Sequence, residues 1–423
     1  MKVFKFGGAS VKDADAVRNI ESILKLYKDE PLLVVISAMG KTTNALEKVV
    51  KSLYTQEGNP IDYLSEVKEF HKDIMDKLFS NPDNEVYDQI NNYFTEIEWV
   101  LEDDTSKGYD FIYDQIVCFG ELISTRIIQS YLKQQGANIS FLDARDCVIT
   151  DNSFRQAKIN WAVTSKKIND KVPAMLSEKS SIIITQGFIG STSENFNITL
   201  GREGSDYSAS IFAYSLEAEG VYIWKDVPGV LNADPKFFED AQPLESLNSR
   251  DAIELAYFGA SVIHPKTIQP LENKNIPLYV KSFMKPDLKG TIISNTVQTK
   301  PLIPCFIFKK NQVLISISSN DFTFIAEDNL RDIFSIFSEH AVRMNVMQNS
   351  AISFSVCIDE DKIKLPLLID SLQQKYLVLY NDKLELYTIR HYFQSTIDDL
   401  TQNREILLEQ RSRNTVQLLM KSE

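Results

Sequence analysis

The chain has 423 residues, of which 58 are acidic and 45 basic, so its formal net charge at pH 7 is −13. A chain of this length is expected to fold as two or three compact units. The acidic balance argues against binding to nucleic acid or to an anionic membrane surface, and no stretch is apolar enough to predict a membrane span. The four cysteines lie far apart and form no metal or redox spacing, which favours a cytoplasmic location.

The first predicted element is a strand over residues 2–6, in which apolar side chains alternate with lysines. Gly7 and Gly8 end this strand, and a helical pattern begins after Asp13. Open α/β sheets bind their ligands at the carboxyl ends of strands, and glycine lets backbone N–H groups approach an anion closely. Lys5 adds a cation beside this loop, although it could also be a surface residue of an edge strand. The pattern matches neither the P-loop nor the dinucleotide fingerprint.

A second strand is predicted over residues 32–36, because its five residues are all apolar, which is typical of a strand buried on both faces. Small and hydroxyl-bearing residues follow, including Thr43, and this loop is either a second part of a site or the start of the helix expected over residues 45–53. Residues 61–104 are helical in pattern and predict a lobe of helices beside the sheet, with no identifiable chemistry.

Residues 109–133 predict another helical stretch, and Glu121 stands among its apolar residues. A charged group in such surroundings needs a partner. A ligand ammonium group would be one such partner, but a glutamate on a helix surface would give the same pattern. Both interpretations remain open at this point.

The strongest signal for an anion site is Gly201 to Ser208, which follows strands predicted over residues 139–142 and 181–185. Two glycines, Arg202, Ser205 and Asp206 precede an apolar, helix-competent run there. A helix N-terminus favours anions, and an arginine can bind a carboxylate or phosphate with two parallel hydrogen bonds. Asp206 would either cap the helix or hold a lysine or metal beside phosphates. Taken alone, the stretch could also be a glycine-rich turn with an N-cap.

The next strand is predicted over residues 221–224, and Lys225, Asp226 and Lys236 follow in a segment with Pro-Gly and Asp-Pro turns. These charges either contact a nucleotide or belong to a solvated loop. A helix is predicted over residues 249–257 and a strand over residues 278–281, and residues 290–293 close the unit. This repeated strand–loop–helix order predicts a parallel sheet with helices on both faces.

The composition changes near residues 299–301, and a smaller α+β region is predicted beyond that point. No glycine occurs after Gly290. This absence matters because loops that close over a small effector usually need glycine. The expected strands and helices are, in order, a strand at 313–317, a helix at 329–339, a strand at 351–358, a helix at 365–374, a strand at 384–390, a helix at 396–409 and a strand at 415–419.

Together, five motifs in this order resemble the aspartate kinases of the amino-acid kinase superfamily. The resemblance covers residues 1 to about 295 and implies a three-layer α/β sandwich around a mainly parallel sheet for residues 1–297. Residues 298–423 resemble the paired ACT regulatory domains, with one full unit at about 310–377 and a short second unit. The motifs are Lys5–Ser10; Ser37-Ala38 with Thr43-Asn44; Gly120–Leu122 with Ser124-Thr125; Gly201–Tyr207; and Trp224–Lys236 with Gly259-Ala260 and His264-Pro265.

The resemblance implies ATP-dependent phosphorylation of the side-chain carboxylate of L-aspartate to 4-phospho-L-aspartate, the first step toward lysine, threonine and methionine. The catalytic residues would be Lys5 and Asp206, with Mg²⁺ accompanying ATP and no protein metal site. Aspartate would be bound by Thr43, Glu121, Thr199, Arg202 and Ser205. The nucleotide would be bound by Lys5, Gly7, Gly8, Lys225, Asp226, Leu231 and Lys236. No general base is needed, because an aspartate side chain titrates near ~3.9 and is ionised at neutral pH.

Three positions depart from the family pattern. Glu203 stands where glycine is frequent, Leu231 where an aromatic residue often faces the nucleotide, and Ser261 where lysine is common. The alternatives are another member of the superfamily, such as a glutamate kinase, or a regulatory subunit that only binds ligands. We expect a homodimer built through the ACT-like tails, because strand edges in such small units are usually paired.

Overall fold

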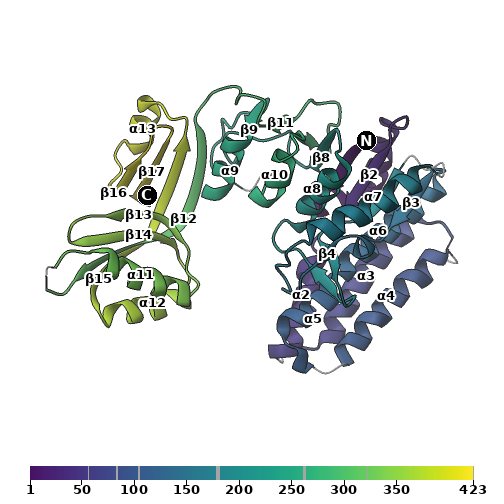
Figure 1. The fold of residues 1–423 in the computed structure, drawn as a ribbon, viewed down its shortest axis with the longest axis horizontal. Coiled ribbons are helices and arrows are strands. Elements are labelled where there is room, and N and C mark those ends of the chain that lie inside the picture. The colour runs from purple at the N-terminus through teal and green to yellow at the C-terminus, as the bar shows by residue number, and fades with distance from the viewer. Residues whose placement is uncertain are drawn as a thin grey trace. The chain divides into compact units, whose positions relative to one another are not determined.

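The computed structural model describes residues 1–55, 57–81, 84–102, 105–177, 182–260, 263–321 and 323–422. They form two compact units (Figure 1). Unit 1 comprises Met1–Val230, Pro243–Ile253 and Val262–Thr299, and unit 2 comprises Leu231–Gln242, Glu254–Ser261 and Lys300–Glu423.

Unit 1 is built on an eight-stranded sheet with the order β3-β5-β2-β1-β8-β10-β11-β9. Its strand pairs are parallel except for β10 with β11. The predicted parallel sheet is therefore confirmed, with the N-terminal strand β1 in its interior. The strands are β1 (Lys2–Phe6), β2 (Leu32–Ile36), β3 (Ile139–Leu142), β5 (Ile182–Gln186), β8 (Gly220–Lys225), β9 (Ser246–Asn248), β10 (Leu278–Ser282) and β11 (Thr291–Ser294).

Neighbouring residues of β1 show that helices cover both faces of this sheet, because successive side chains of a strand point to opposite faces. Phe4 packs its ring 4.8 Å from that of Tyr27, which follows α1 (Ala14–Lys25). Lys5 instead contacts Asp206 of α8 (Gly204–Leu216). The sheet thus forms the middle of three layers, as the fold class requires.

The remaining helices of this part of the chain surround the sheet and a small three-stranded sheet, ordered β4-β6-β7 (Figure 1). None of the helices in the described ranges is long and apolar enough to cross a bilayer. The small sheet contains β4 (Ile149–Thr150), β6 (Ile189–Thr192) and β7 (Asn197–Thr199). The helices are α2 (Thr42–Thr55), α3 (Pro60–Leu78), α4 (Glu85–Glu102), α5 (Tyr109–Val117), α6 (Phe119–Gln134), α7 (Trp161–Ser177) and α10 (Pro265–Glu272). The helix α9 (Ser249–Phe258) begins in unit 1 and ends in unit 2.

Unit 2 contains a six-stranded antiparallel sheet with the order β13-β14-β12-β15-β17-β16. Side chains of α11 and α12 form one hydrophobic core with β12, β14 and β15, which gives a complete β-α-β-β-α-β unit. The other half of the sheet has one helix, α13. The elements are β12 (Cys305–Ser319), α11 (Glu327–Glu339), β13 (Met344–Asn349), β14 (Ser353–Asp359), α12 (Lys364–Gln373), β15 (Tyr376–Arg390), α13 (Gln394–Thr401), β16 (Ile406–Arg411) and β17 (Thr415–Lys421).

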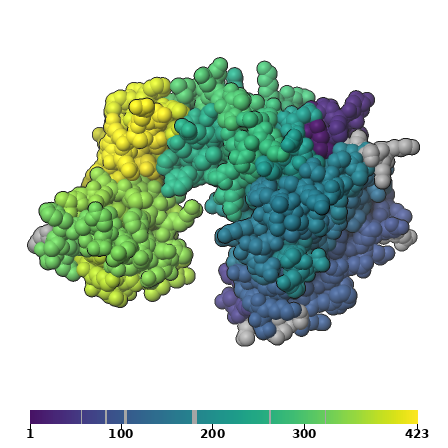
Figure 2. Space-filling view, in the orientation of Figure 1, coloured from purple at the N-terminus to yellow at the C-terminus, as the bar shows by residue number. Residues whose placement is uncertain are grey.

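Two details of unit 2 differ from the prediction. The helix expected over residues 396–409 is wrong beyond Thr401, because Asn403 adopts a left-handed backbone with φ 61° and residues 406–411 then pair with β17. A segment from the middle of the chain also belongs to this unit. The Phe237 ring lies 4.9 Å from that of Phe308, and Phe238 packs on side chains of the C-terminal strands. In Figure 2, teal-green atoms from the middle of the chain lie beside yellow atoms from its C-terminal part.

Candidate functional site

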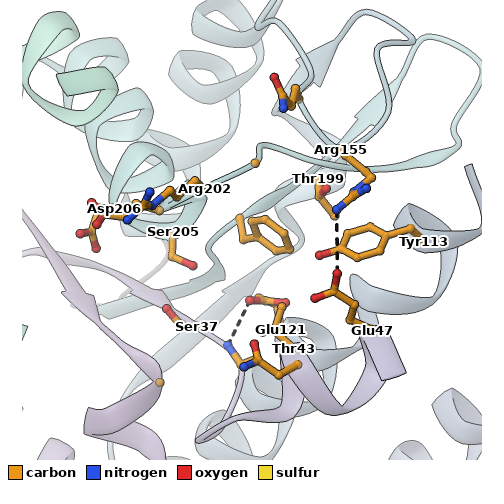
Figure 3. Close-up of a pocket in the computed structure, with 18 of the residues that line it drawn as sticks. Ser37, Thr43, Glu47, Tyr113, Glu121, Arg155, Thr199, Arg202, Ser205 and Asp206 are labelled. Carbon is orange, nitrogen blue, oxygen red and sulfur yellow. Dashed lines mark hydrogen bonds and ion pairs between the residues drawn. The ribbon is translucent and has the colours of Figure 1, made fainter. Parts of the chain in front are cut away.

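A cavity of about 910 Å³ opens on unit 1 where β1 and β8 end and α8 begins. Figure 3 shows Arg202, Ser205 and Asp206 on one side of it and Glu121, Glu47 and Tyr113 on the other. Most of the predicted site residues therefore come together in one place. Those that line the cavity are Lys5, Gly8, Thr43, Glu121, Thr199, Arg202, Ser205, Asp206 and Lys225.

The Asp206 carboxylate lies between two lysines at the floor of the cavity. Its Oδ1 is 2.5 Å from Lys5 Nζ, and its Oδ2 is 3.7 Å from Lys225 Nζ. Burial alone would raise the pKa of this carboxyl group, but the two ammonium groups hold that pKa below its ordinary value. Asp206 therefore remains ionised and fixes both cations, whereas the N-cap position of α8 belongs to Glu203.

The turn that leads into α8 depends on close backbone packing. Glu203 has a left-handed backbone with φ 53°, and its side chain makes no capping hydrogen bond. A Cβ atom on Gly204 would lie 2.5 Å from a ring atom of Phe188, so only glycine is accommodated there. Gly8 is constrained in the same way, because its Cβ would lie 2.8 Å from the carbonyl oxygen of Gly40. These glycines bring main-chain N–H groups to the cavity wall, where an anion can be bound.

Glu121 stands in the first turn of α6 and is only 2 % exposed. Its Oε1 accepts a hydrogen bond from the Ala38 N–H at 3.2 Å, and its Oε2 has no hydrogen-bond partner among the described residues. Burial raises the pKa of this carboxyl group to about 8, although the Ala38 N–H and Lys5 lower it in part. A buried carboxyl group with an unsatisfied oxygen is matched to a cationic ligand group.

Arg202 provides the opposite charge. It is exposed, lines the cavity and makes no ion pair within the described part of the chain. Ser205 lines the cavity beside it, whereas Thr43 lines the cavity beside Glu121 (Figure 3). Ser205 is held close to β5, since a Cβ on Gly187 would lie 2.6 Å from the Cβ of Ser205. An anionic group can therefore meet the Arg202 guanidinium group and the Ser205 hydroxyl group here.

Thr199 lines the cavity and is held there by hydrogen bonds to helix α5. It is fully buried, and its hydroxyl group donates a hydrogen bond to Asp114 Oδ1 at 2.6 Å. Asp114 Oδ2 also accepts the backbone N–H groups of Thr199 at 3.0 Å and Arg155 at 2.9 Å. Burial raises the pKa of Asp114 to about 6, against the lowering effect of these hydrogen bonds. Thr199 therefore joins two walls of the cavity, and any contact with substrate stays a prediction.

The sequence did not predict the part of the cavity wall that surrounds Arg155. Its guanidinium group is 3.1 Å from Asp110 Oδ1 and 3.9 Å from Glu47 Oε1, and it lies over the Tyr113 ring at 4.4 Å (Figure 3). Arg155 also has φ 65°, which is unusual for a residue other than glycine. These residues are far apart in sequence and form no motif, so only the fold brings them together.

The other predicted nucleotide contacts do not line this cavity. Gly7 lies near its floor, because a Cβ there would be 3.1 Å from Lys5 Nζ, while Asp226 is exposed after β8. Leu231 and Lys236 belong to unit 2, so their contact with a nucleotide stays a prediction. Ser261 lies outside the described residues.

No group of three or more histidine, cysteine, aspartate or glutamate side chains that could hold a metal ion occurs in the described ranges. Asp206, the acidic residue at the floor of the cavity, is already paired with two lysines. A divalent cation at this site would therefore be held mainly by ligand oxygens, as is usual for Mg²⁺ with nucleotides.

Three comparisons with known proteins agree with this architecture. The model of the amino acid kinase family matches residues 1–282. The lysine-sensitive aspartokinase 3 of Escherichia coli is 30% identical over 357 residues, which cover 84% of this chain and 78% of the relative. The crystal structure of E. coli aspartokinase III with aspartate and ADP aligns with a TM-score of 0.84 at 26% identity, covering 100% of this chain and 96% of that chain.

Plant relatives are longer than this chain. The chloroplastic aspartokinase 1 of Arabidopsis thaliana is 32% identical over 382 residues, and the match covers 85% of this chain but 64% of the relative. The similarity to both relatives extends past residue 282, because 84–85% of this chain is matched.

Proposed function

This chain belongs to the amino acid kinase family and, within it, to the aspartokinases, and we propose on that premise that it phosphorylates L-aspartate with ATP. The γ-phosphoryl group passes to the side-chain carboxylate, and the products are 4-phospho-L-aspartate and ADP. This reaction is the first step toward lysine, threonine and methionine. The E. coli structure that shares this fold contains aspartate and ADP, which supports the assignment of both ligands.

The observation that carries the proposal is the pairing of opposite charges in one cavity. Glu121 offers a buried, unpartnered oxygen to an ammonium group, and Arg202 offers a guanidinium group to a carboxylate. A free amino acid has both groups, whereas an N-acylated amino acid lacks the ammonium. Lys5 and Asp206 lie at the floor, where the second carboxylate of aspartate and a phosphoryl group can meet.

The chemical difficulty of this reaction is the approach of two anions. An oxygen of the substrate carboxylate forms a bond to the γ-phosphorus, and the bond from that phosphorus to the bridging oxygen of ATP breaks. The carboxylate is already ionised, so the protein need not remove a proton. Lys5 neutralises charge on the phosphoryl oxygens, Asp206 holds Lys5 in place, and N–H groups at the start of α8 add their dipoles. The acyl phosphate is sensitive to water, so a dry site is required.

Mg²⁺ is part of the proposal as the partner of ATP. When bound, it neutralises phosphate charge and fixes the geometry of the phosphate chain. Its support is the chemistry of the nucleotide, since Mg²⁺ commonly uses substrate phosphates as ligands.

The direct test is ADP release with ATP and Mg²⁺ in the presence of either L-aspartate or L-glutamate, with hydroxylamine to trap the acyl phosphate as a hydroxamate. Aspartate-dependent hydroxamate at a kcat/KM well above that for glutamate is expected. Preference for glutamate would indicate a glutamate kinase. ATP binding without turnover on either acceptor would indicate a regulatory subunit.

We further propose a cytoplasmic homodimer with the domain boundary near residues 297–298 and dimerisation through the ACT-like region. The six-stranded sheet of unit 2 ends in β13 and β16, and Met347 and Ile406 on these edge strands are exposed. Exposed edge strands are usually covered in native proteins. Light scattering at micromolar concentration should therefore report twice the chain mass of 48.2 kDa, and a monomer would contradict this prediction.

A further inference from the structure

Lys5 and Lys225 present their ammonium groups from neighbouring strands to the same space. In the parallel pair of β1 and β8, Lys5 is the register partner of Ile223, and Lys225 lies two residues farther along β8. Residues two apart in a strand point to the same face of the sheet. Both lysines therefore project from the face on which α8 lies, and both ammonium groups reach Asp206.

The charges in this group do not balance. One carboxylate, on a residue that is 3% exposed, stands between two ammonium groups, so the trio carries one excess positive charge. This excess is local, since the whole chain has a formal net charge of −13. The Lys225 side chain is 22% exposed and that of Lys5 is 10% exposed, so Lys225 offers more of its surface to the cavity. Two ammonium groups that share one carboxylate beside a helix N-terminus favour the binding of an anion.

We propose that Lys225 is a second catalytic cation, which contacts the transferred phosphoryl group from the β8 side while Lys5 contacts it from the β1 side. This inference rests on the proposed function. As the bond between the γ-phosphorus and the leaving oxygen breaks, ADP keeps the electron pair and negative charge is spread over three equatorial oxygens. Two ammonium groups held apart by one carboxylate can neutralise oxygens on different sides of the phosphorus. No proton changes place in this step.

The competing explanation is that Lys225 only keeps Asp206 ionised and oriented. The two roles differ in what they do to nucleotide affinity, because a cation on the γ-phosphoryl group strengthens the binding of ATP and leaves ADP unaffected. A structural role changes the affinities for both nucleotides together. The test therefore compares wild type, Lys225→Met and Lys225→Arg by calorimetric titration with Mg²⁺–ATP and Mg²⁺–ADP, and by kcat in the hydroxamate assay.

Lys281 on the next strand provides a matched control. It is the register partner of Trp224, so its side chain lies on the opposite face from Lys225, with Nζ 5.6 Å from the centre of the Trp224 ring. Lys281→Met removes the same charge from the adjacent strand without touching the cavity. It should leave kcat and both nucleotide affinities at wild-type values.

We expect Lys225→Met to lower kcat by about 10²-fold, as the loss of one group that stabilises transition-state charge commonly does. The Kd for ATP should rise about tenfold and that for ADP less than about twofold, a difference typical of one lost charge-assisted contact. Lys225→Arg should recover much of both losses. Equal changes in ATP and ADP affinity, or a kcat within threefold of wild type, would overturn the inference.

Two controls keep the result interpretable. If wild type itself forms no hydroxamate, the proposed function fails, whereas turnover by wild type with an unimpaired Lys225→Met variant rejects only the role of Lys225. If Lys225→Met melts below the assay temperature, Lys225→Gln is compared with Lys225→Arg instead. A Lys225→Gln variant with the ATP preference of wild type would then reject the proposal.

Discussion

Aspartate binding should become stronger as the pH rises toward 8, because Glu121 must be ionised to pair with the substrate ammonium. Its side chain is buried, one of its oxygens has no partner among the described residues, and burial raises its pKa to about 8. With a pKa of about 8, the carboxyl group is ionised in about 1% of the free enzyme at pH 6 and in about half of it at pH 8. The apparent KM for aspartate should therefore fall about 50-fold across this interval.

The assay is the initial rate at saturating ATP over pH 6 to 8.5, with kcat and KM separated. Glu121 does not touch the transferred group in the proposed mechanism, so kcat should change much less than KM. Glu121→Gln keeps the shape but cannot ionise, so its KM at pH 8 should rise by about 10- to 100-fold, the value of a charged hydrogen bond. Its pH dependence near 8 should disappear. A phase near pH 6 that survives in this variant would belong to Asp114, whose pKa is about 6.

The raised pKa of Glu121 also makes the stability of the folded protein depend on pH. Because the folded pKa of about 8 exceeds the ordinary value of 4.5, Glu121 favours the folded state fully below pH 4.5, and this contribution is lost as the pH rises through 8. At about 1.4 kcal/mol per pKa unit, the loss is at most on the order of 5 kcal/mol. Glu121→Gln should therefore resist urea better than wild type at pH 8.5 and about equally at pH 5. A wild-type KM that is flat from pH 6 to 8.5, or equal stability of both proteins at pH 8.5, would refute the reasoning.

Two other substitutions test the floor and the turn of the cavity. Lys5→Met should lower kcat by at least about 10²-fold with an unchanged circular dichroism spectrum, because it removes a phosphoryl contact, and near-normal turnover would exclude Lys5 from the mechanism. Glu203→Gly should raise the free energy of unfolding in urea by about 1 kcal/mol, since glycine adopts φ 53° without strain. The control is Glu217→Gly, because Glu217 has φ 49° at the other end of α8. Both substitutions should stabilise the folded protein, but only Glu203→Gly should change the KM for aspartate. A Glu203→Gly variant that is less stable than wild type would contradict the strain argument.

Local patterns were sufficient to predict the elements that carry the chemistry. The alternation at residues 2–6 and the apolar run at 32–36 predict β1 and β2, because burial of these strands depends on a short stretch of chain. The run after Gly204 predicts α8 for the same reason. Lys5 and Asp206 follow from these elements, since both stand where a strand or helix meets a loop. Their contact joins residues 201 positions apart and depends on the fold. It was predicted from the resemblance to a family and not from a local pattern.

The remaining features depend on contacts between distant segments, so no local pattern signals them. Asp114 stands in an ordinary helical sequence, and its role appears only when Thr199 and Arg155 are brought to it. The assignment of residues 231–242 to unit 2 depends likewise on packing against the C-terminal strands. The helix expected at 396–409 failed because its polar residues suit a helix, whereas pairing with β17 decides the structure of 406–411.

Three of the six non-glycine residues that have left-handed backbones in the described part of unit 1 line the cavity. Arg155, Phe188 and Glu203 all line it with left-handed backbones, at φ 65°, 66° and 53°. Such conformations cost on the order of 1–3 kcal/mol each and persist only where the surroundings fix them. Hydrogen bonds from distant residues do so here, since the Arg155 N–H donates to Asp114 and the Phe188 N–H donates to Ser208 Oγ.

This arrangement links stability to function at specific positions. A left-handed residue turns its side chain away from the path of a regular strand or turn, and in this cavity that places a guanidinium group, an aromatic ring and a carboxylate on the wall. Glycine at the same positions would relieve the strain but would remove the group that faces the ligand. We therefore expect glycine at position 155, 188 or 203 to increase the free energy of unfolding. The same substitutions should weaken the binding of substrate, because they remove side chains from the cavity wall.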